Sequence, residues 1–332
     1  MNRTVRIAVS IAVSAVFLGF AVRKVDWSEA LAALAAAHYF YVLPMYAVTI
    51  WTLYIRSQRW RLLLRPVGTP PLRTLFAATN IGFAANALLP LRVGEVIRPV
   101  FVSRKEHEPL GGILATIVLE RIFDMFTILF LFGVAASLVA VSGEVRQWGY
   151  RLCALAVAIG SGVAFIRWQE ALALRLVHGG LRLLPHRLAE PIDRFVRGFI
   201  QALEILDSPL TFLQVLAWSL YLWLAISGIY LLGLLQFELP VPLLVGSIAV
   251  SAVVAIAVSV PSAPSAIGAF QLGCVLSLAI FQVSESHAIA YSIVAQVTQF
   301  VAIVSAGLYS LAREGVSMQQ VERLSEADGA TA

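Results

Sequence analysis

The sequence predicts an all-α, polytopic helical membrane protein. Three observations carry this prediction: 60% of the 332 residues are hydrophobic, only 13% are charged, and the mean hydropathy is +0.85. A soluble domain usually carries about 25% charged residues, so soluble enzymes are excluded. The apolar runs are continuous and close to the ~20 residues that a spanning helix needs, whereas a β-barrel would show alternation.

The net charge of +5 comes almost entirely from arginine. In a membrane chain, excess arginine marks cytoplasmic loops that face anionic headgroups, so we expect no nucleic-acid partner. This pattern predicts a multi-pass protein of the cell (inner) membrane with both termini in the cytoplasm. The charge pattern does not indicate an oligomeric state.

Six apolar segments are predicted to be full spans. The first follows Arg3 and Arg6 but lacks a small-x-small cleavage site, so it is interpreted as an uncleaved span rather than a signal peptide. The six segments are Val5–Val22, Tyr39–Ile55, Ile113–Val141, Tyr150–Ile166, Leu210–Leu235 and Ala288–Leu311.

Three further segments connect or follow these spans. Trp27–Ala37 is predicted to be a short helix at the far interface. The second span is expected to end in a cytoplasmic basic loop that contains Arg56, Arg59, Arg61, Arg65 and Arg73. Residues 167–209 hold six arginines with apolar residues at helical spacing, which indicates amphipathic helices on the cytoplasmic surface or, alternatively, a solvated loop. The transmembrane domain then covers residues 1–313, and residues 314–332 form a short cytoplasmic tail.

The first region that resists a simple span count is residues 72–104, where an apolar segment is followed by Pro90 and Gly94. A full crossing would place the arginine-rich 167–209 segment outside, whereas a re-entrant element keeps it inside. Of the 24 Lys and Arg residues, the re-entrant arrangement leaves 17 in the cytoplasm, because only seven lie elsewhere. Those seven are Arg23, Lys24, Arg146 and Arg151 outside, and Arg92, Arg98 and Arg121 at membrane depth. This asymmetry favours re-entry.

The second region, residues 241–283, is broken between Pro261 and Gly268. It forms either a hairpin to mid-depth or two full crossings, and loop charges do not distinguish these. Both regions pair a proline with a glycine shortly before a polar side chain, and one opens from the cytoplasm while the other opens from outside. That arrangement indicates an inverted repeat. The candidate hinge residues are Pro90, Gly94, Pro261, Pro264 and Gly268.

Charged residues inside the membrane mark the candidate site, because each costs about 2.5–3.5 kcal/mol on insertion scales. One interpretation is a neutralising ion-pair network that pins the first broken element to its neighbouring span. The other is a receptor for a phosphate-type anion, made by two guanidiniums and a new helix N-terminus. In a bilayer such an anion is a lipid headgroup. The candidate substrate-binding residues are Arg92, Arg98, Glu95, Glu120, Arg121, Asp124, Asn86 and Gln271.

Several catalytic motifs are absent from the sequence. It contains no G-x-x-x-x-G-K-[ST], no H-E-x-x-H and no G-x-S-x-G. We therefore expect no enzymatic activity, no metal and no cofactor. Two alternatives stay open: a membrane-embedded transferase that uses Glu95, Glu120 or Asp124 on a lipid headgroup, and a structural partner of an envelope-lipid enzyme.

Three stretches together resemble a known family, the flippase-like transmembrane domain of lysylphosphatidylglycerol synthase/flippase proteins. They are Leu89–Arg98, Thr116–Asp124 and Pro261–Gln271, and the resemblance extends over roughly Arg3 to Arg313. It implies movement of a polar lipid or lipid-linked group across the membrane, with a lipid-synthesising enzyme as a partner. The soluble aminoacyl-transferring domain of the two-part relatives is missing, so the chain is not expected to make lysyl-lipid itself.

The chain departs from the family at its third motif, which usually reads Pro-Gly and ends in Glu. Here it reads Pro264-Ser265 and ends in Gln271. The departure predicts a stiffer hinge, and a proton-carrying carboxylate is not carried over to this position.

Overall fold

The computed structural model is helical over the residues that it describes, which confirms the predicted fold class. These residues are 3–89, 92–138, 186–259, 263–317 and 320, with single positions between 147 and 175. About half of the predicted span at 150–166 and most of the segment 167–185 lie outside the described residues, as do the tail beyond 320 and the hinge residues Pro90 and Pro261.

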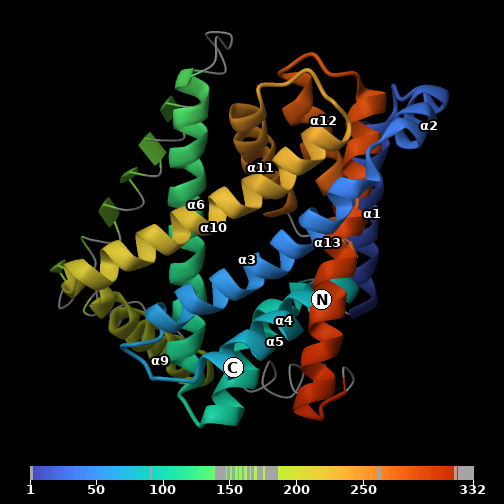
Figure 1. Cartoon of the computed structure of the whole chain (residues 1–332). Helices are drawn as coiled ribbons and strands as arrows, with labels where there is room; N and C mark the ends of the chain where they lie inside the picture. Colours follow the sequence, from blue (N-terminus) through green and yellow to red (C-terminus); the bar gives the residue numbers. More distant parts are fainter. Residues whose placement is uncertain are drawn as a thin grey trace.

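The described helices follow the predicted segments closely (Figure 1). They are α1 (Arg3–Val22), α2 (Trp27–Ala36), η1 (Tyr39–Tyr41), α3 (Val42–Leu63), α4 (Leu72–Leu88), α5 (Gly94–Glu106), α6 (Leu110–Leu138), α9 (His186–Ala202), η3 (Leu203–Asp207), α10 (Pro209–Gln236), α11 (Leu243–Ser259), η4 (Pro264–Ala266), α12 (Ala269–Ala279) and α13 (Glu285–Glu314).

Fewer helices qualify as spans by length and composition than the six expected. Among the residues searched, α10 and α13 qualify alone, and α2 with the η1–α3 segment, bent by 72°, forms a third candidate. Helix α6, with 29 residues, carries Glu120, Arg121 and Asp124. These charges are tolerated there because they are paired within the protein, as shown below.

Local sequence fixes where the long helices begin and end. Asp26 caps α2 by accepting hydrogen bonds from the backbone N–H of Ser28 and Glu29. Ser208 caps α10 in the same way, with Pro209 in the first helical position, where its missing N–H costs nothing. Gly315 ends α13 in the left-handed conformation that glycine adopts without a Cβ clash.

Helix α3 corrects one prediction, because it continues to Leu63 instead of ending at Ile55. Arg56 and Arg59 therefore lie inside the helix and face the protein interior, and their assignment to a cytoplasmic loop is wrong. The apolar face continues past them through Trp60 and Leu63, both fully buried. Burial of the arginines is possible because carboxylates on α6 pair with them.

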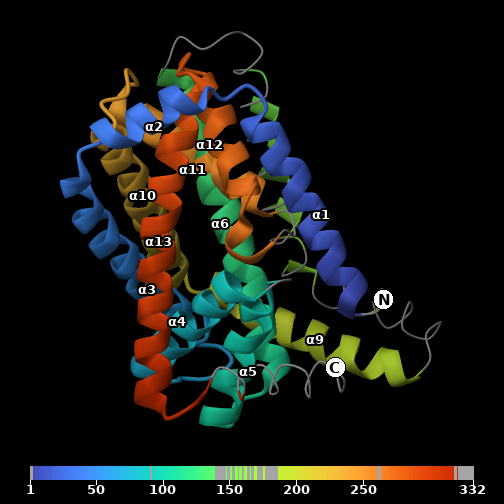
Figure 2. The same cartoon turned by 90° about the vertical axis from the view of Figure 1, so that its right-hand side faces the viewer.

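Each of the two broken regions forms a pair of packed helices. Helices α4 and α5 pack on each other at one end of the molecule, and α11 and α12 do so at the other end (Figures 1 and 2). The long helix α13 contacts both α4 and α12. Its first turn lies beside Glu29, which follows Asp26 at the start of α2, and its last turn pairs with Lys105 at the end of α5. The two hairpins therefore open at opposite ends of the molecule, as the predicted inverted repeat requires.

Helices of this length favour re-entrant hairpins over double crossings. Helix α11 has 17 residues and α12 has 11, whereas a bilayer core takes about 20 per span. How deep either hairpin enters the membrane stays a prediction.

Candidate functional site

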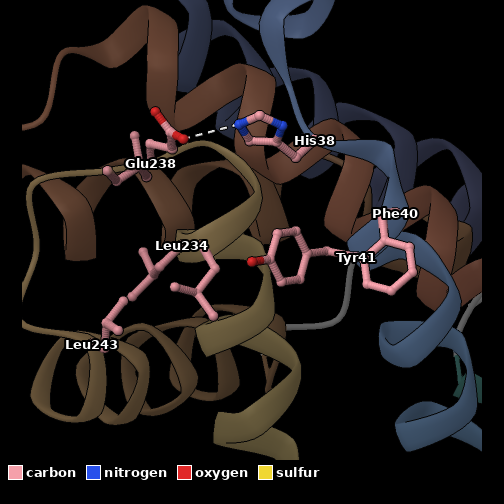
Figure 3. A pocket seen from close by; sticks show the side chains of 8 residues that line it. His38, Phe40, Tyr41, Leu234, Glu238 and Leu243 are labelled. Carbon is pink, nitrogen blue, oxygen red and sulfur yellow. Dashed lines mark hydrogen bonds and ion pairs between the residues drawn. The ribbon is translucent and has the colours of Figure 1, made fainter.

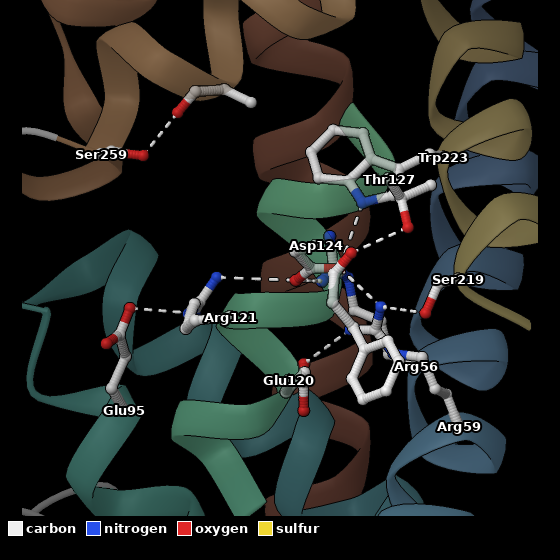
Figure 4. Close-up of polar contacts among 12 residues, drawn as sticks. Arg56, Arg59, Glu95, Glu120, Arg121, Asp124, Thr127, Ser219, Trp223 and Ser259 are labelled. Carbon is white, nitrogen blue, oxygen red and sulfur yellow. Dashed lines mark hydrogen bonds and ion pairs between the residues drawn. The ribbon is translucent and has the colours of Figure 1, made fainter. Parts of the chain in front are cut away.

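The predicted intramembrane charges meet where α3, α5 and α6 come together, and they separate into two groups. We call the first the buried cluster: Arg56, Arg59, Arg98, Glu120 and Asp124. The second, which we call the outer triad, is Arg92, Glu95 and Arg121. Glu120 and Asp124 are four residues apart on α6 and share one face. Arg121 points toward Glu95, and its Nη1 also lies 4.0 Å from Asp124 Oδ2, so it joins the two groups (Figure 4).

Arg59 lies at the centre of the buried cluster and is 0% exposed. Its Nη1 donates to Asp124 Oδ1 at 2.5 Å and to Ser219 Oγ at 3.1 Å. Its Nη2 lies 3.2 Å from Oε1 of Glu120. Trp223 on α10 also donates its indole N–H to Asp124, at 3.1 Å. The guanidinium therefore holds α3, α6 and α10 together.

Arg98 completes the buried cluster from α5. Its Nη2 lies 2.9 Å from Glu120 Oε2, and its guanidinium lies over the Trp60 ring, 3.8 Å from the centroid. Trp60 is fixed in turn by donating to Thr116 Oγ1 at 2.9 Å. Paired and stacked in this way, Arg98 has the surroundings of a structural ion pair. Its assignment as a substrate contact stays a prediction.

The outer triad is partly exposed, in contrast to the buried cluster. Arg92 Nη1 lies 3.4 Å from Glu95 Oε1, and Arg121 Nη2 lies 3.0 Å from the same oxygen. The side chains of Arg92, Glu95 and Arg121 are 36%, 32% and 45% exposed. Two guanidiniums thus share one carboxylate, and the group carries one excess positive charge on a face that a ligand can reach.

The two breaks meet at the outer triad. Arg92 Nη2 donates to the backbone carbonyl of Val258, in the last turn of α11, at 2.9 Å. Such a carbonyl has no helical partner, and a cation there is favoured by the helix dipole. Helix α4 also contacts η4 directly. The predicted likeness of the two breaks is thus matched by their contact in space.

Both breaks hold strained backbone at the motif residues. Arg92 has φ 54° and Ser265 has φ 56°, in the left-handed region that costs non-glycine residues of order 1–3 kcal/mol. Gly268 adopts φ 87° without this cost. Gly94 lies so close to α4 that an added Cβ would stand 1.9 Å from the Gly82 carbonyl oxygen. Pro264 begins η4.

Asn86 and Gln271 hold the breaks in similar ways. Asn86 Oδ1 accepts the backbone N–H of Gly94 at 2.8 Å, and Gln271 Oε1 accepts that of Gly268 at 2.7 Å. Gln271 also donates to Gln296, which donates to the Ser265 carbonyl. These contacts give both amides a structural role, and substrate binding by either one stays a prediction.

Sequence reasoning missed Arg56, Arg59, Ser219, Trp223 and Gln296 as members of this region. For the two arginines a signal was present: they are three residues apart on one helical face, and the apolar pattern continues beyond them. For Ser219, Trp223 and Gln296 no local signal exists, because only the packing of α10 and α13 brings them to the site.

A cavity of about 490 Å³ lies at the α2 end of the molecule, away from the buried cluster and the outer triad (Figure 3). Its walls come from η1, the end of α10 and the start of α11. His38 Nε2 and Glu238 Oε1 meet there at 2.9 Å. No member of the buried cluster or outer triad lines it.

The model of the lysylphosphatidylglycerol synthase TM region matches residues 7–307 of the chain. The chain belongs to this family. As a member of the lysylphosphatidylglycerol synthase TM region family with apolar helices long enough to cross a bilayer, it is a multi-pass membrane protein.

One curated relative in this comparison is named glycosyltransferase AglD, from Haloferax volcanii. It is 26% identical over 144 residues, which are 43% of this chain and 23% of the relative. The chain therefore matches less than a quarter of that protein's length. No solved structure matches the chain.

Proposed function

We propose that this protein translocates a polar lipid, anionic or lipid-linked, across the cell membrane, with the headgroup held at the outer triad. The observation that carries the proposal is the position of Arg92 and Arg121, two partly exposed guanidiniums that share Glu95 where the two breaks meet. The acyl tails would stay in the bilayer while the headgroup passes between the hairpins.

The chemistry of the outer triad suits a phosphate-type anion. Guanidiniums bind phosphate through paired, charge-assisted hydrogen bonds that are about twice as strong as neutral ones. The triad lies at the N-terminus of α5, where the helix dipole favours negative charge. Glu95 holds both arginines when the site is empty, and the three side chains of the triad together carry one excess positive charge.

The buried cluster would serve this site as a rigid support. Three arginines against two carboxylates leave it with one positive charge, which adds to the attraction for an anion from behind the triad. Its members bond to one another across α3, α5 and α6, and Asp124 also accepts a hydrogen bond from Trp223 of α10, so the cluster holds α6 and its Arg121 in place.

The family and the relative are both compatible with work on membrane lipids or glycan carriers. The family description names lysylphosphatidylglycerol synthase, and the relative is named a glycosyltransferase; neither activity is assigned to this chain. We propose a non-enzymatic translocator with cytoplasmic termini that is assisted by a lipid-synthesising enzyme. The two alternative functions are a headgroup transferase and a structural partner of an envelope-lipid enzyme.

The test uses the full chain in liposomes that contain fluorescent phosphatidylglycerol. We expect Arg92→Gln/Arg121→Gln to slow headgroup transfer about tenfold or more, because each lost bond to a charged group is worth ~1.5–3 kcal/mol. Arg61→Gln/Arg65→Gln is the control: it removes the same charge from two exposed positions outside the site. Transfer is measured by quenching of the fluorophore in the outer leaflet.

Equal transfer by the two double variants would overturn the site. Transfer no faster than in protein-free liposomes, with a new lipid product on thin-layer chromatography, would favour the transferase. Neither transfer nor product, with a second chain co-purifying, would favour the structural partner.

A further inference from the structure

A basic cavity of about 640 Å³ lies at the end of the molecule opposite α2, at the open end of the hairpin formed by α4 and α5. Its walls come from α3, α4, α5 and α13, and it shares no lining residue with the outer triad or the buried cluster. The lining residues that matter here are Tyr54, Arg73, Phe76, Lys105, Tyr309 and Arg313, with Ser310 and Glu314 beside them.

The cavity carries an excess of positive charge. Lys105 pairs with Glu314, which ties the end of α5 to the end of α13. Arg73 and Arg313 are exposed, and within the part of the chain that the structure describes neither forms an ion pair. Two guanidiniums are therefore available to an anion in the same cavity.

Neutral groups complete the lining in a pattern that suits a lipid headgroup. The Ser310 hydroxyl accepts the amide N–H of Asn80 at 3.0 Å and, among the described residues, donates to no acceptor, so its proton is available to a ligand. Tyr54, Phe76 and Tyr309 supply aromatic faces. Aromatic residues of this kind are enriched at the level of lipid headgroups, where one side is apolar and the other wet.

We propose that this cavity binds the phosphate of an anionic phospholipid, with the phosphate between Arg73 and Arg313 and the glycerol against the aromatic rings. The size falls within the range of ~300–1,000 Å³ usual for small-molecule sites. This binding does not rest on the proposed translocation. A bound phosphate competes with Glu314 for Lys105, so occupancy loosens the tie between α5 and α13.

The experiment titrates the purified full chain in detergent with dihexanoylphosphatidylglycerol and follows binding by calorimetry. We expect Arg73→Gln/Arg313→Gln to weaken binding about tenfold or more, since two charge-assisted contacts are lost. The control Arg61→Gln/Arg65→Gln, at the same end but outside the cavity, should bind as the natural sequence does. Arg73→Lys/Arg313→Lys should keep most of the affinity. Thermal melting verifies that each variant is folded.

Three further arms separate the possible sources of the phosphate. Dihexanoylphosphatidylcholine should bind more weakly, because its headgroup carries no net charge. Glycerol 3-phosphate should also bind more weakly, because it lacks the chains. The binding step that Arg73→Gln/Arg313→Gln removes should persist in Arg92→Gln/Arg121→Gln, which distinguishes this cavity from the outer triad.

Equal affinities for the cavity double variant and its control would overturn the proposal. Equal affinities for glycerol 3-phosphate and dihexanoylphosphatidylglycerol would overturn the assignment of the ligand as a lipid. Equal affinities for dihexanoylphosphatidylcholine and dihexanoylphosphatidylglycerol would overturn the requirement for an anionic headgroup.

Discussion

Arg59 shows how a single residue can join three helices. It pairs with Glu120 and Asp124 and also donates to Ser219, with no exposure to solvent or lipid. Loss of one partner from a buried ion pair leaves the other charges uncompensated, which costs about 3–5 kcal/mol. By contrast, the partly exposed side chains of the outer triad can be rehydrated.

We therefore expect Arg59→Leu to lower the free energy of unfolding by ~3–5 kcal/mol. Unfolding in denaturant, with the protein in mild detergent, measures it. Arg61→Leu, two residues along and exposed, is the matched control and should change stability by less than about 0.5 kcal/mol. Similar stability of the two variants would show that Arg59 is not a structural centre.

The same residue marks a limit of sequence reasoning. A span was predicted to end at the first arginine because an isolated charge at membrane depth is costly. The rule fails at Arg56 and Arg59 because Glu120 and Asp124 come from a helix distant in the chain. An ion-pair network around the carboxylates on α6 was one of the two predicted interpretations, but which arginines pair with them is decided by the packing of α3 against α6.

At the scale of elements, the first hairpin depends on the close approach of α4 and α5. A Cβ on Gly94 would stand 1.9 Å from the Gly82 carbonyl oxygen, and because that oxygen belongs to the backbone, only a shift of a helix could relieve the clash. The glycine before the charged motif was predicted as a hinge, and the structure adds that it is a contact point between helices. Only the packing of the two helices could show that.

We expect Gly94→Ala to push α4 and α5 apart and to destabilise the protein by ~1–3 kcal/mol, the usual cost of overpacking. Gly228→Ala on α10 is the control, because its added Cβ meets nothing within 4 Å. It should be neutral or stabilise by up to about 1 kcal/mol. Melting temperatures in detergent compare the two. Equal melting temperatures would mean that the hairpin accommodates the methyl group.

For the whole molecule, the sequence pattern indicated two opposed broken regions, and the structure has hairpins at opposite ends that meet through Arg92 and Val258. The pairing of α11 with α12 follows from their short lengths and the break between them. That the two breaks touch could not be predicted, because it depends on a hydrogen bond from one side chain to a carbonyl 166 positions away in the chain.

This arrangement predicts that the ends of the two hairpins face opposite sides of the membrane. In a Cys153→Ser/Cys274→Ser background, Thr69→Cys probes the loop before α4 and Lys24→Cys probes the loop before α2, and both positions are exposed. We expect a membrane-impermeant maleimide to label them from opposite faces of sealed vesicles. Arg65→Cys should be labelled from the same face as Thr69→Cys. Labelling of Thr69→Cys and Lys24→Cys from one face would contradict the opposed orientation.

The buried pairing of Arg59 also constrains how the chain is made. Arg59 is synthesised 65 residues before Asp124, an interval of roughly 3–13 seconds at usual rates of translation. Throughout that interval its guanidinium lacks its carboxylate partners and is held near water by the cost of burial. We therefore expect helix α3 to reach its final depth only after α6 has left the ribosome, so that the two helices enter the bilayer together although they are not neighbours in the chain.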